Sequence, residues 1–240
     1  VGSEMCIRDR LSCIWRKSYL SKRGKFWGRD IIMTQTEIEK LVKKQRDFFN
    51  SGETLNVSFR ISALEKLRAC IIKYEKKINK AIRADLGKSA FESYMCETGL
   101  VLSELTYMIK HTRKYAKERT VRTPLAQFHS RSYQKPSPYG VVLIMSPWNY
   151  PLMLTFEPLV DALAAGNTAI VKPSAYSANT SELISHMLRE CFDEKYVAVV
   201  TGGREENTCL LNENFDYIFF TGSQSVGKEV MRCASAHLTP

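Results

Sequence analysis

Four short segments of the 240-residue sequence place polar, cationic or small side chains directly after apolar runs. They are Ser146-Pro-Trp-Asn149, Lys172-Pro-Ser174, Thr201-Gly-Gly203 and Thr221-Gly-Ser-Gln-Ser-Val-Gly227. The apolar run before each segment has the composition of a buried parallel strand. Because the carboxyl ends of parallel strands meet at one edge of a sheet, where ligands bind in open α/β folds, we expect the four segments to lie together.

The amide of Asn149 can serve either local structure or chemistry. Asn149 lies between an apolar run and Pro151, whose fixed φ suits the first turn of a helix. An asparagine at such a position commonly caps the helix, and for the residue taken alone this is the commoner role. The alternative is that its amide donates a hydrogen bond to a developing oxyanion at the sheet edge.

Lys172 and the turn that begins at Thr221 each have two interpretations as well. Lys172 ends an apolar strand, where its ammonium can donate to ribose hydroxyls or a phosphate, or can simply snorkel to solvent. Gly222 and Ser223 open a helix whose N–H groups and dipole would suit a phosphate. The spacing matches neither GxGxxG nor the Walker pattern, so Ser223 as an ordinary helix cap is the simpler interpretation. Gly202 and Gly203 are also compatible with a plain turn.

The elements that must position these segments follow from a strand–helix alternation that begins near residue 139. The predicted strands are Gly140–Met145, Thr168–Lys172, Val197–Thr201 and Tyr217–Phe220, and the predicted helices are Leu152–Ala165, Ser177–Phe192, Glu205–Leu211 and Val226–Ser235. Four consecutive βα units predict an α/β fold with a parallel sheet and right-handed crossovers. Such sheets usually have more strands, so we expect this one to be incomplete at its C-terminal end.

The region before the sheet is helical in period over residues 33–118. Three apolar stripes are predicted to face the core: Ile38, Leu41, Val42, Phe48 and Phe49, interrupted by Gln45; Leu64, Leu67, Ile71, Ile72, Tyr74 and Ile78; and, in a helix over Tyr94–Lys110, Met95, Leu102, Leu105 and Ile109. Residues 119–138 lose this period and contain three prolines, which limits them to short edge strands. We interpret them as a connector or an arm that could reach a partner subunit.

Residues 1–32 show neither helical nor strand period. An Arg- and Ser-rich mitochondrial transit peptide is one interpretation. We favour a non-native leader without regular structure, with Met33 as the native start, because a clear helix signal begins immediately after Met33.

Charge and cysteine usage exclude several function classes. The net charge is +10, but the first 32 residues contribute about half of it and no groove-reading motif accompanies the rest, so we expect no nucleic-acid partner. The seven cysteines are odd in number and never spaced as CxxC, which argues against a metal site or a disulfide framework and for a reducing, cytoplasmic location. No apolar run reaches membrane-spanning length.

Taken together, the segments PWNYP, AAGNTAIVKPS, VVTGG and FFTGSQSVGK resemble the aldehyde dehydrogenase superfamily over residues 36–240. The short N-terminal helices and the ending ASAHLTP are similar to the class 3, or fatty aldehyde dehydrogenase, branch. The resemblance implies a Rossmann-like cofactor-binding domain over residues 139–240 and oxidation of an aldehyde to a carboxylic acid with NAD or NADP.

The resemblance also implies a role for each candidate residue. Asn149 matches the family's asparagine that donates to the oxyanion formed when a cysteine thiolate attacks the aldehyde. The positions that match the cofactor-binding motifs are Trp148, Lys172, Ser174, Gly202, Gly222, Ser223, Val226 and Gly227. One departure is Ala175, where the family commonly has a glutamate that accepts from ribose hydroxyls. Its loss also removes a repulsion against a 2′-phosphate, so we expect NADP to be tolerated better than usual.

The family's nucleophile lies in a Gly-Gln-x-Cys context and its general base in a Leu-Glu-Leu-Gly-Gly context, and neither occurs in these 240 residues. We therefore expect the N-terminal part of such an enzyme, inactive by itself, that forms a homodimer when full length. A membrane anchor could lie only beyond Pro240. The alternatives are a naturally short, non-catalytic nucleotide-binding or interaction module and an acyl-CoA-linked reductase of similar fold.

Overall fold

The computed structural model describes residues 33–240, which include a parallel four-stranded sheet in the order β5-β4-β3-β6. Its elements are β3 (Val141–Met145), α6 (Met153–Ala165), β4 (Thr168–Lys172), α7 (Ala178–Cys191), β5 (Val197–Val199), α8 (Arg204–Leu211), β6 (Tyr217–Phe220) and α9 (Gln224–Ala234). Each element lies within two residues of its predicted bounds. The α/β prediction is therefore confirmed. The predicted leader, residues 1–32, lies outside the described residues.

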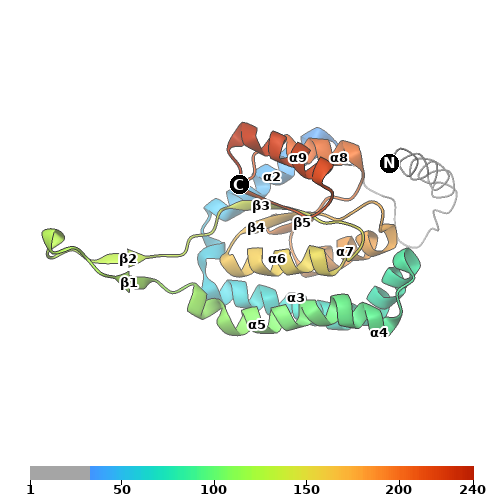
Figure 1. Ribbon diagram of the computed structural model, residues 1–240, viewed down its shortest axis with the longest axis horizontal. Helices are drawn as coiled ribbons and strands as arrows, with labels where there is room; N and C mark the ends of the chain where they lie inside the picture. Colours follow the sequence, from blue (N-terminus) through green and yellow to red (C-terminus); the bar gives the residue numbers. More distant parts are fainter. Residues whose placement is uncertain (1–32) are drawn as a thin grey trace, which may run out of the picture. The chain divides into compact units, whose positions relative to one another are not determined.

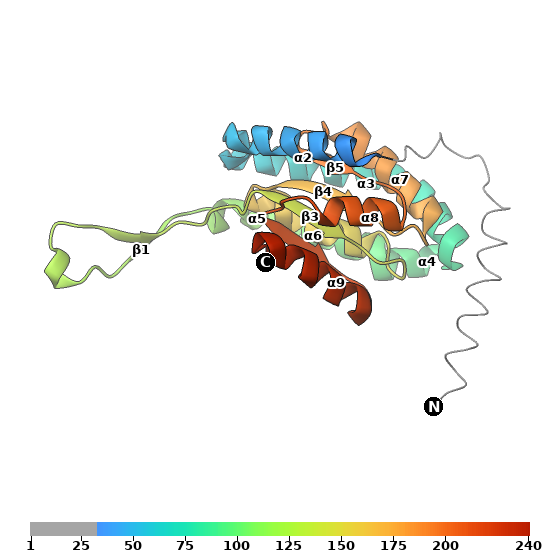
Figure 2. The ribbon, with the colours of Figure 1, turned by 90° about the horizontal axis from the view of Figure 1, so that it is seen from above.

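Helices cover both faces of the sheet (Figure 1). Alternate strand residues point to opposite sides, so Val142 and Ile144 join one core while Val141, Leu143 and Met145 join the other. The first core also contains residues of α3 (Val57–Leu86), α5 (Gly99–Tyr115), α6 and α7. The second contains residues of α2 (Gln35–Asn50), α8 and α9, with α8 between α2 and α9 (Figure 2).

The start of α2 agrees with its sequence signal, and its inner face holds an unexpected polar residue. Thr34 and Glu37 form a capping box, in which the Thr34 N–H donates to Glu37 Oε2 at 2.8 Å. Gln45, which interrupts the apolar stripe, is fully buried. Its Nε2 donates to the carbonyl oxygens of Ala169 at 2.9 Å and Glu194 at 3.0 Å, so it joins α2 to the sheet.

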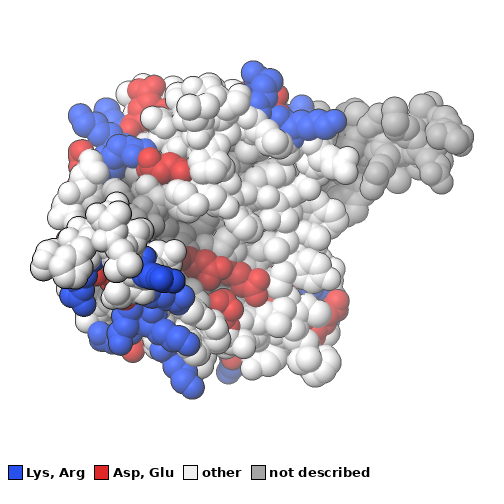
Figure 3. Space-filling view, turned by 60° about the vertical axis from the view of Figure 1, so that its left-hand side comes forward, with Lys and Arg blue, Asp and Glu red and all other residues white. Residues whose placement is uncertain are grey.

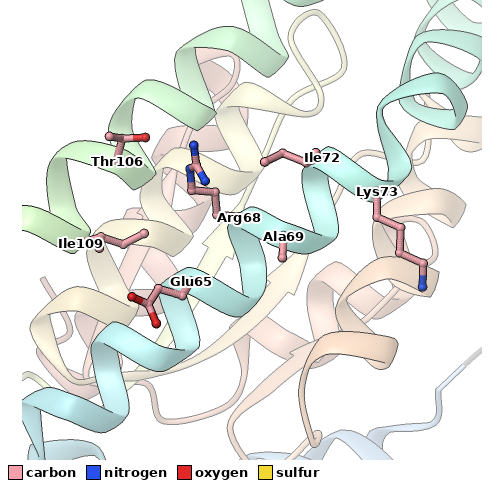
Figure 4. A pocket seen from close by; sticks show the side chains of 7 residues that line it. All are labelled: Glu65, Arg68, Ala69, Ile72, Lys73, Thr106 and Ile109. Atoms are coloured by element: carbon pink, nitrogen blue, oxygen red, sulfur yellow. The ribbon is translucent and has the colours of Figure 1, made fainter.

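Five predicted core residues are not fully buried, and two of them, Leu102 and Ile109, are half-buried against the first core. Phe49 is only half-buried, while Ile72 and Met95 are 47% and 55% exposed. Ile72 lies about 100° around α3 from the buried Ile71, and it lines an open groove between α3 and α5 (Figure 4). The other residues of this groove are Glu65, Arg68, Ala69, Lys73, Thr106 and Ile109.

Met95 is exposed because the predicted helix over Tyr94–Lys110 is interrupted. A short α4 (Ala90–Ser93) continues into a π-helical turn, η2 (Tyr94–Thr98), before α5 begins. The wider turn adds a residue and rotates the face that points inward. Gly99 ends this turn, and a Cβ there would lie 2.7 Å from the Tyr94 carbonyl oxygen.

Residues 119–134 form an antiparallel hairpin that projects from the sheet and its helices (Figure 1). Its strands are β1 (Arg119–Val121) and β2 (Ser132–Gln134), with a 3-10 turn, η3 (Leu125–Gln127), between them. Leu125 and Phe128 at the tip are 88% and 77% exposed. The arm is therefore present, and its contact with a partner stays a prediction.

On the face that Figure 3 draws, Lys and Arg atoms gather at the lower left beside a group of Asp and Glu atoms, and much of the rest of the face carries neither. At the edge beside β6, the Ile218 N–H donates to the Pro240 carbonyl oxygen at 3.0 Å. Within residues 33–240, no helix combines the length and the apolar character that crossing a bilayer requires.

Gly166, which ends α6, cannot carry a side chain without strain. Its φ is +98°, and a Cβ would lie 2.6 Å from the guanidinium carbon of the buried Arg60. Arg60 is held there by hydrogen bonds from its Nε to Thr54 O at 2.7 Å and from Nη2 to Leu55 O at 3.2 Å.

We expect Gly166→Ala to lower the free energy of unfolding by about 2–4 kcal/mol, because it adds backbone strain and displaces Arg60. Urea unfolding followed by circular dichroism measures the loss. Gly87→Ala is the matched control, because Gly87 has φ +73° and open space around it, so it should lose only about 1 kcal/mol. Equal losses in the two variants would contradict a role for the Arg60 contact.

Candidate functional site

The four segments singled out in the sequence do start from one edge of the sheet. The backbone N–H groups just beyond the strands donate to neighbouring strand ends: Ser146 to Lys172 O at 3.2 Å, Val200 to Val171 O at 2.9 Å, and Thr221 to Met145 O at 3.1 Å. These bonds continue the parallel ladder by one residue and bring the loops after β3, β4, β5 and β6 together at its carboxyl edge.

Asn149 does not cap α6. Its side chain is exposed, and within residues 33–240 its amide makes no hydrogen bond. The cap is instead Glu97, whose Oε2 accepts from the Leu152 N–H at 2.8 Å and the Met153 N–H at 3.5 Å. A carboxylate is well suited to this place because it satisfies orphan N–H groups at the positive end of the helix dipole. The Asn149 amide is thereby left available at the sheet edge.

A second charged residue, Lys88, holds the same loop. Its Nζ lies 2.6 Å from Glu97 Oε1, donates to the Asn149 carbonyl oxygen at 3.0 Å, and lies 4.0 Å from the centroid of the Tyr150 ring. The Glu97 side chain is fully buried and that of Lys88 is 11% exposed. Sequence reasoning missed both residues, because one is a lysine among many and the other lies in a helical pattern.

Hydroxyl groups fix the other side of the same loop. The Thr155 hydroxyl donates to the Pro151 carbonyl oxygen at 2.6 Å, so Ser146 Oγ donates to Thr155 Oγ1, also at 2.6 Å. Thr155 is fully buried and Ser146 nearly so. Trp148, between the two prolines of the loop, is 53% exposed. The loop therefore presents Trp148 and Asn149 outward from a backbone that is bonded on both sides.

Lys172 is buried at the end of β4 and contacts the loop after β5. Its side chain is not the snorkelling lysine that one interpretation suggested, because the residue is only 4% exposed and Nζ donates to Gly202 O at 2.8 Å and Pro173 O at 3.0 Å. Burial lowers the pKa of the ammonium to about 8, against the opposing effect of the Glu206 carboxylate. Lys172 and Gly202 are thus brought into direct contact.

Glu206 is a further residue that sequence reasoning missed, although a signal for it exists. Its Oε2 accepts from the Gly203 N–H at 2.6 Å, which is the backbone half of a capping box at the start of α8. Gly202 has φ +128°, and a Cβ there would lie 2.3 Å from the Glu206 carboxyl carbon. The spacing Gly203-x-x-Glu206 is the pattern that could have revealed it.

The remaining candidates occupy turns. Ser174 Oγ accepts from the Tyr176 N–H at 3.2 Å. Ser223 is the N-cap of α9, as the simpler interpretation held, and accepts from the Val226 N–H at a long 3.5 Å. Gly222 leaves no room for a Cβ, which would lie 2.6 Å from the Phe220 ring. Val226 is 44% exposed and Gly227 is half-buried, so the first turn of α9 is open to a ligand.

Comparison with known proteins identifies the family. A profile of the aldehyde dehydrogenase family matches residues 22–240. The chain belongs to the aldehyde dehydrogenase family. It is 44% identical over 203 residues to 4,4'-diaponeurosporen-aldehyde dehydrogenase of Staphylococcus aureus. These aligned residues cover 85% of this chain and 44% of that protein. It is 42% identical to aldehyde dehydrogenase family 3 member A2 of Rattus norvegicus, over 85% of this chain and 42% of that protein.

Solved structures of aldehyde dehydrogenases share the fold. The substrate-bound state of Staphylococcus aureus AldH superposes with a TM-score of 0.83 at 44% identity, covering 85% of this chain and 44% of the other. The NAD+ complex of a Bacillus cereus aldehyde dehydrogenase superposes with a TM-score of 0.77 at 25% identity, covering 86% of this chain and 42% of the other. The chain therefore spans less than half the length of these relatives. The expected resemblance to the superfamily and to its class 3 branch is confirmed.

The cysteines that the structure describes are free thiols, and all of them except Cys96 lie in or beside the two cores. Cys70 and Cys191 are buried where α3 meets α7, and Cys209 and Cys233 pack half-buried against the second core. A hydrogen bond with Cys70, together with burial, raises the pKa of Cys191, which disfavours a thiolate. Cys191, Cys209 and Cys233 therefore have the positions of structural thiols, and of the three only Cys191 is buried.

The lowered pKa of Lys172 makes stability depend on pH. Below pH 8 the native state buries a charged ammonium at a cost, and this cost disappears as the pH rises from the folded value of about 8 toward the unfolded value of about 10.4. We therefore expect the wild type to gain about 1–2 kcal/mol of unfolding free energy relative to Lys172→Met between pH 7.5 and pH 9.5.

Urea unfolding of both proteins at the two pH values measures this gain. The control is Lys228→Met, which removes an exposed lysine of α9 and should differ from the wild type by the same amount at both pH values. A constant difference for Lys172→Met would show that the buried ammonium keeps an ordinary affinity for its proton.

Proposed function

We propose that this chain supplies the cofactor-binding part and the oxyanion-donating amide of an NAD(P)-dependent aldehyde dehydrogenase that oxidises aldehydes to carboxylic acids. The observation that carries the proposal is the Asn149 amide, which is exposed and free of hydrogen bonds within residues 33–240 while Glu97 caps the helix in its place. The two relatives described above are named as aldehyde dehydrogenases, which supports the proposal.

The polar groups at the sheet edge fit a dinucleotide. The first turn of α9 offers backbone N–H groups and a positive dipole end to a pyrophosphate, next to the small Gly222 and Ser223. Lys172 could donate to ribose hydroxyls if it exchanged one of its two carbonyl partners, and Ser174 and Gly202 lie on the same loops. When bound, the nicotinamide would supply the hydride acceptor, and we place it beside Trp148.

The role of Asn149 is electrostatic. Attack of a thiolate on an aldehyde converts the carbonyl oxygen into an oxyanion, and an amide N–H aimed at that oxygen stabilises the transition state more than the ground state. The two prolines around the loop and the bonded backbone of Asn149 limit its movement, so the amide need not reorganise during the reaction.

We expect Asn149→Ala to lower kcat for aldehyde oxidation by about 10²–10³-fold, because one oxyanion donor is lost. The measurement uses the protein expressed from the full reading frame of the source, with NAD(P)H absorbance as the readout. The Kd for the cofactor should be unchanged, and Asn50→Ala at the exposed end of α2 is the matched control. An Asn149→Ala variant that retains the wild-type kcat would reduce Asn149 to a loop residue.

Cofactor choice is the second part of the proposal. Ala175 is exposed on the loop after β4, where it adds no carboxylate near Lys172, and the nearby Glu206 carboxylate is already bonded to the Gly203 N–H. A 2′-phosphate would therefore meet less repulsion than in relatives with a glutamate at this position. A relative from Canis lupus familiaris, 41% identical, is named a dimeric, NADP-preferring aldehyde dehydrogenase.

We expect Ala175→Glu to raise the Kd for NADPH at least about tenfold relative to the Kd for NADH, because the new carboxylate would lie close to the 2′-phosphate. Fluorescence titration of the chain with NADH and NADPH measures both constants. Ala175→Gln keeps the size without the charge and should leave the ratio unchanged. Strong preference of the wild-type chain for NADH would remove the hypothesis.

The hairpin of β1 and β2 completes the proposal as a contact between two copies of the chain. Its tip exposes Leu125 and Phe128, and β2 exposes Tyr133 by 55%. Exposed aromatic and aliphatic side chains on a projecting arm are suited to burial against a second subunit. The dimeric name of the Canis lupus familiaris relative supports a homodimer.

A further inference from the structure

We propose that Lys88 and Glu97 are positioning residues that clamp the backbone around Asn149 and thereby aim its amide at the aldehyde oxygen. The inference rests on the proposed function, since it concerns how the oxyanion donor is held. We assign neither residue a contact with substrate or cofactor, because both bind the loop that follows β3 and would act through it.

Lys88 and Glu97 bind the loop through both kinds of backbone group, a carbonyl oxygen and an N–H. The ammonium of Lys88 donates to the Asn149 carbonyl oxygen at 3.0 Å, while the carboxylate of Glu97 accepts from the Leu152 N–H at 2.8 Å. An ion pair of 2.6 Å joins the Lys88 ammonium to the Glu97 carboxylate, so a displacement of one group also moves the other. The Lys88 ammonium also lies over the Tyr150 ring, between these two points. Lys88 and Glu97 thus contact Asn149, Tyr150 and Leu152 directly, and the hydrogen bond of Thr155 holds Pro151 between them.

The clamp matters because the Asn149 side chain has no partner of its own within residues 33–240. Its direction depends on its rotamer and on the backbone that carries it. Clamping the carbonyl oxygen of Asn149 holds the plane of the peptide bond that follows it, and because this plane contains the Asn149 Cα, it limits how far the origin of the side chain can move. A misplacement of about 1 Å at a catalytic group can cost roughly 10²-fold in rate.

The end of α3 and the turn η2 place the charged groups of Lys88 and Glu97 at the loop. Gly87 ends α3 in a left-handed conformation, φ +73°, which turns the chain so that Lys88 follows outside the helix. Glu97 lies in the π-helical turn η2, and this turn closes only because Gly99 has no Cβ against the Tyr94 carbonyl oxygen. π-helical turns occur frequently at functional sites. A plain helical turn would point residue 97 in another direction.

A purely structural ion pair would hold the same residues together but would act on stability alone. The two possibilities differ in how the pair couples to Asn149. If Lys88 and Glu97 act through the Asn149 amide, their removal costs nothing more once that amide is gone, so the effects on kcat are not additive. If they only stabilise the fold, the effects on kcat per folded molecule multiply or are absent.

The first test is therefore a double-mutant cycle in the protein expressed from the full reading frame. The variant Lys88→Met/Glu97→Gln removes both charges together, so that no single charge is left buried. We expect it to lower kcat by about 10–10²-fold with an unchanged cofactor Kd. On the background of Asn149→Ala, it should lower kcat by less than about threefold.

The control variant is Lys73→Met, which breaks the ion pair of Lys73 with Glu190 between α3 and α7, away from the loop. It should leave kcat unchanged. Lys88→Arg keeps the positive charge and should recover most of the kcat lost in Lys88→Met. The inference would be overturned if the effects of Lys88→Met/Glu97→Gln and of Asn149→Ala on kcat multiplied in full. It would also be overturned if Lys88→Met/Glu97→Gln kept the wild-type kcat.

A second readout needs no activity. With Trp15 and Trp27 replaced by phenylalanine, Trp148 is the remaining tryptophan of the chain and lies next to Asn149. Time-resolved anisotropy should show a larger fast component for Trp148 in the Lys88→Met/Glu97→Gln variant than in the Lys73→Met variant. Equal components would overturn the clamp whatever the kinetics show. If the loop loosens but Asn149→Ala leaves kcat unchanged, the clamp stands and the proposed function fails.

Discussion

The structure depends on a parallel sheet whose central strands, β3 and β4, are buried on both faces. All residues of β3 and β4 are buried, and alternate side chains enter two separate cores. Since neither face of β3 and β4 is left for polar groups, the polar residues of these strands, Thr168 and Lys172, lie at the strand ends. That constraint places the loops after the four strands on one edge, and it is why residues far apart in sequence, such as Lys172 and Gly202, come into contact there.

Long polar side chains from the N-terminal helices complete the ends of α6. At its N-terminus Glu97 accepts from two backbone N–H groups, and at its C-terminus Arg60 Nη1 donates to the Ala164 carbonyl oxygen at 3.4 Å. Gln45 plays a similar part for the sheet by donating to Ala169 O. The N-terminal helices therefore share hydrogen bonds as well as a core with the βα region, and α6 depends on them at both ends.

This arrangement separates the groups that hold the site from those that could act in it. Glu97, Lys88, Thr155 and Ser146 have their polar atoms engaged with the loop or with one another. Asn149 and Trp148 project from that loop into solvent. The buried groups fix the backbone in a low-dielectric setting where their hydrogen bonds are strong, and the exposed groups stay available to a ligand.

The sequence by itself determined the strand–helix alternation, the common edge of the four loops and the family. Hydrophobic periodicity and turn residues are local properties, so they can be read from neighbouring positions in the sequence. Only the tertiary structure decided that Asn149 is not a cap, that the third N-terminal helix contains a π-helical turn, and that Ile72 faces an open groove. The physical reason is that these outcomes depend on partners distant in the chain. Glu97 reaches Leu152 across 55 positions, and no periodicity in either segment indicates that the two will meet.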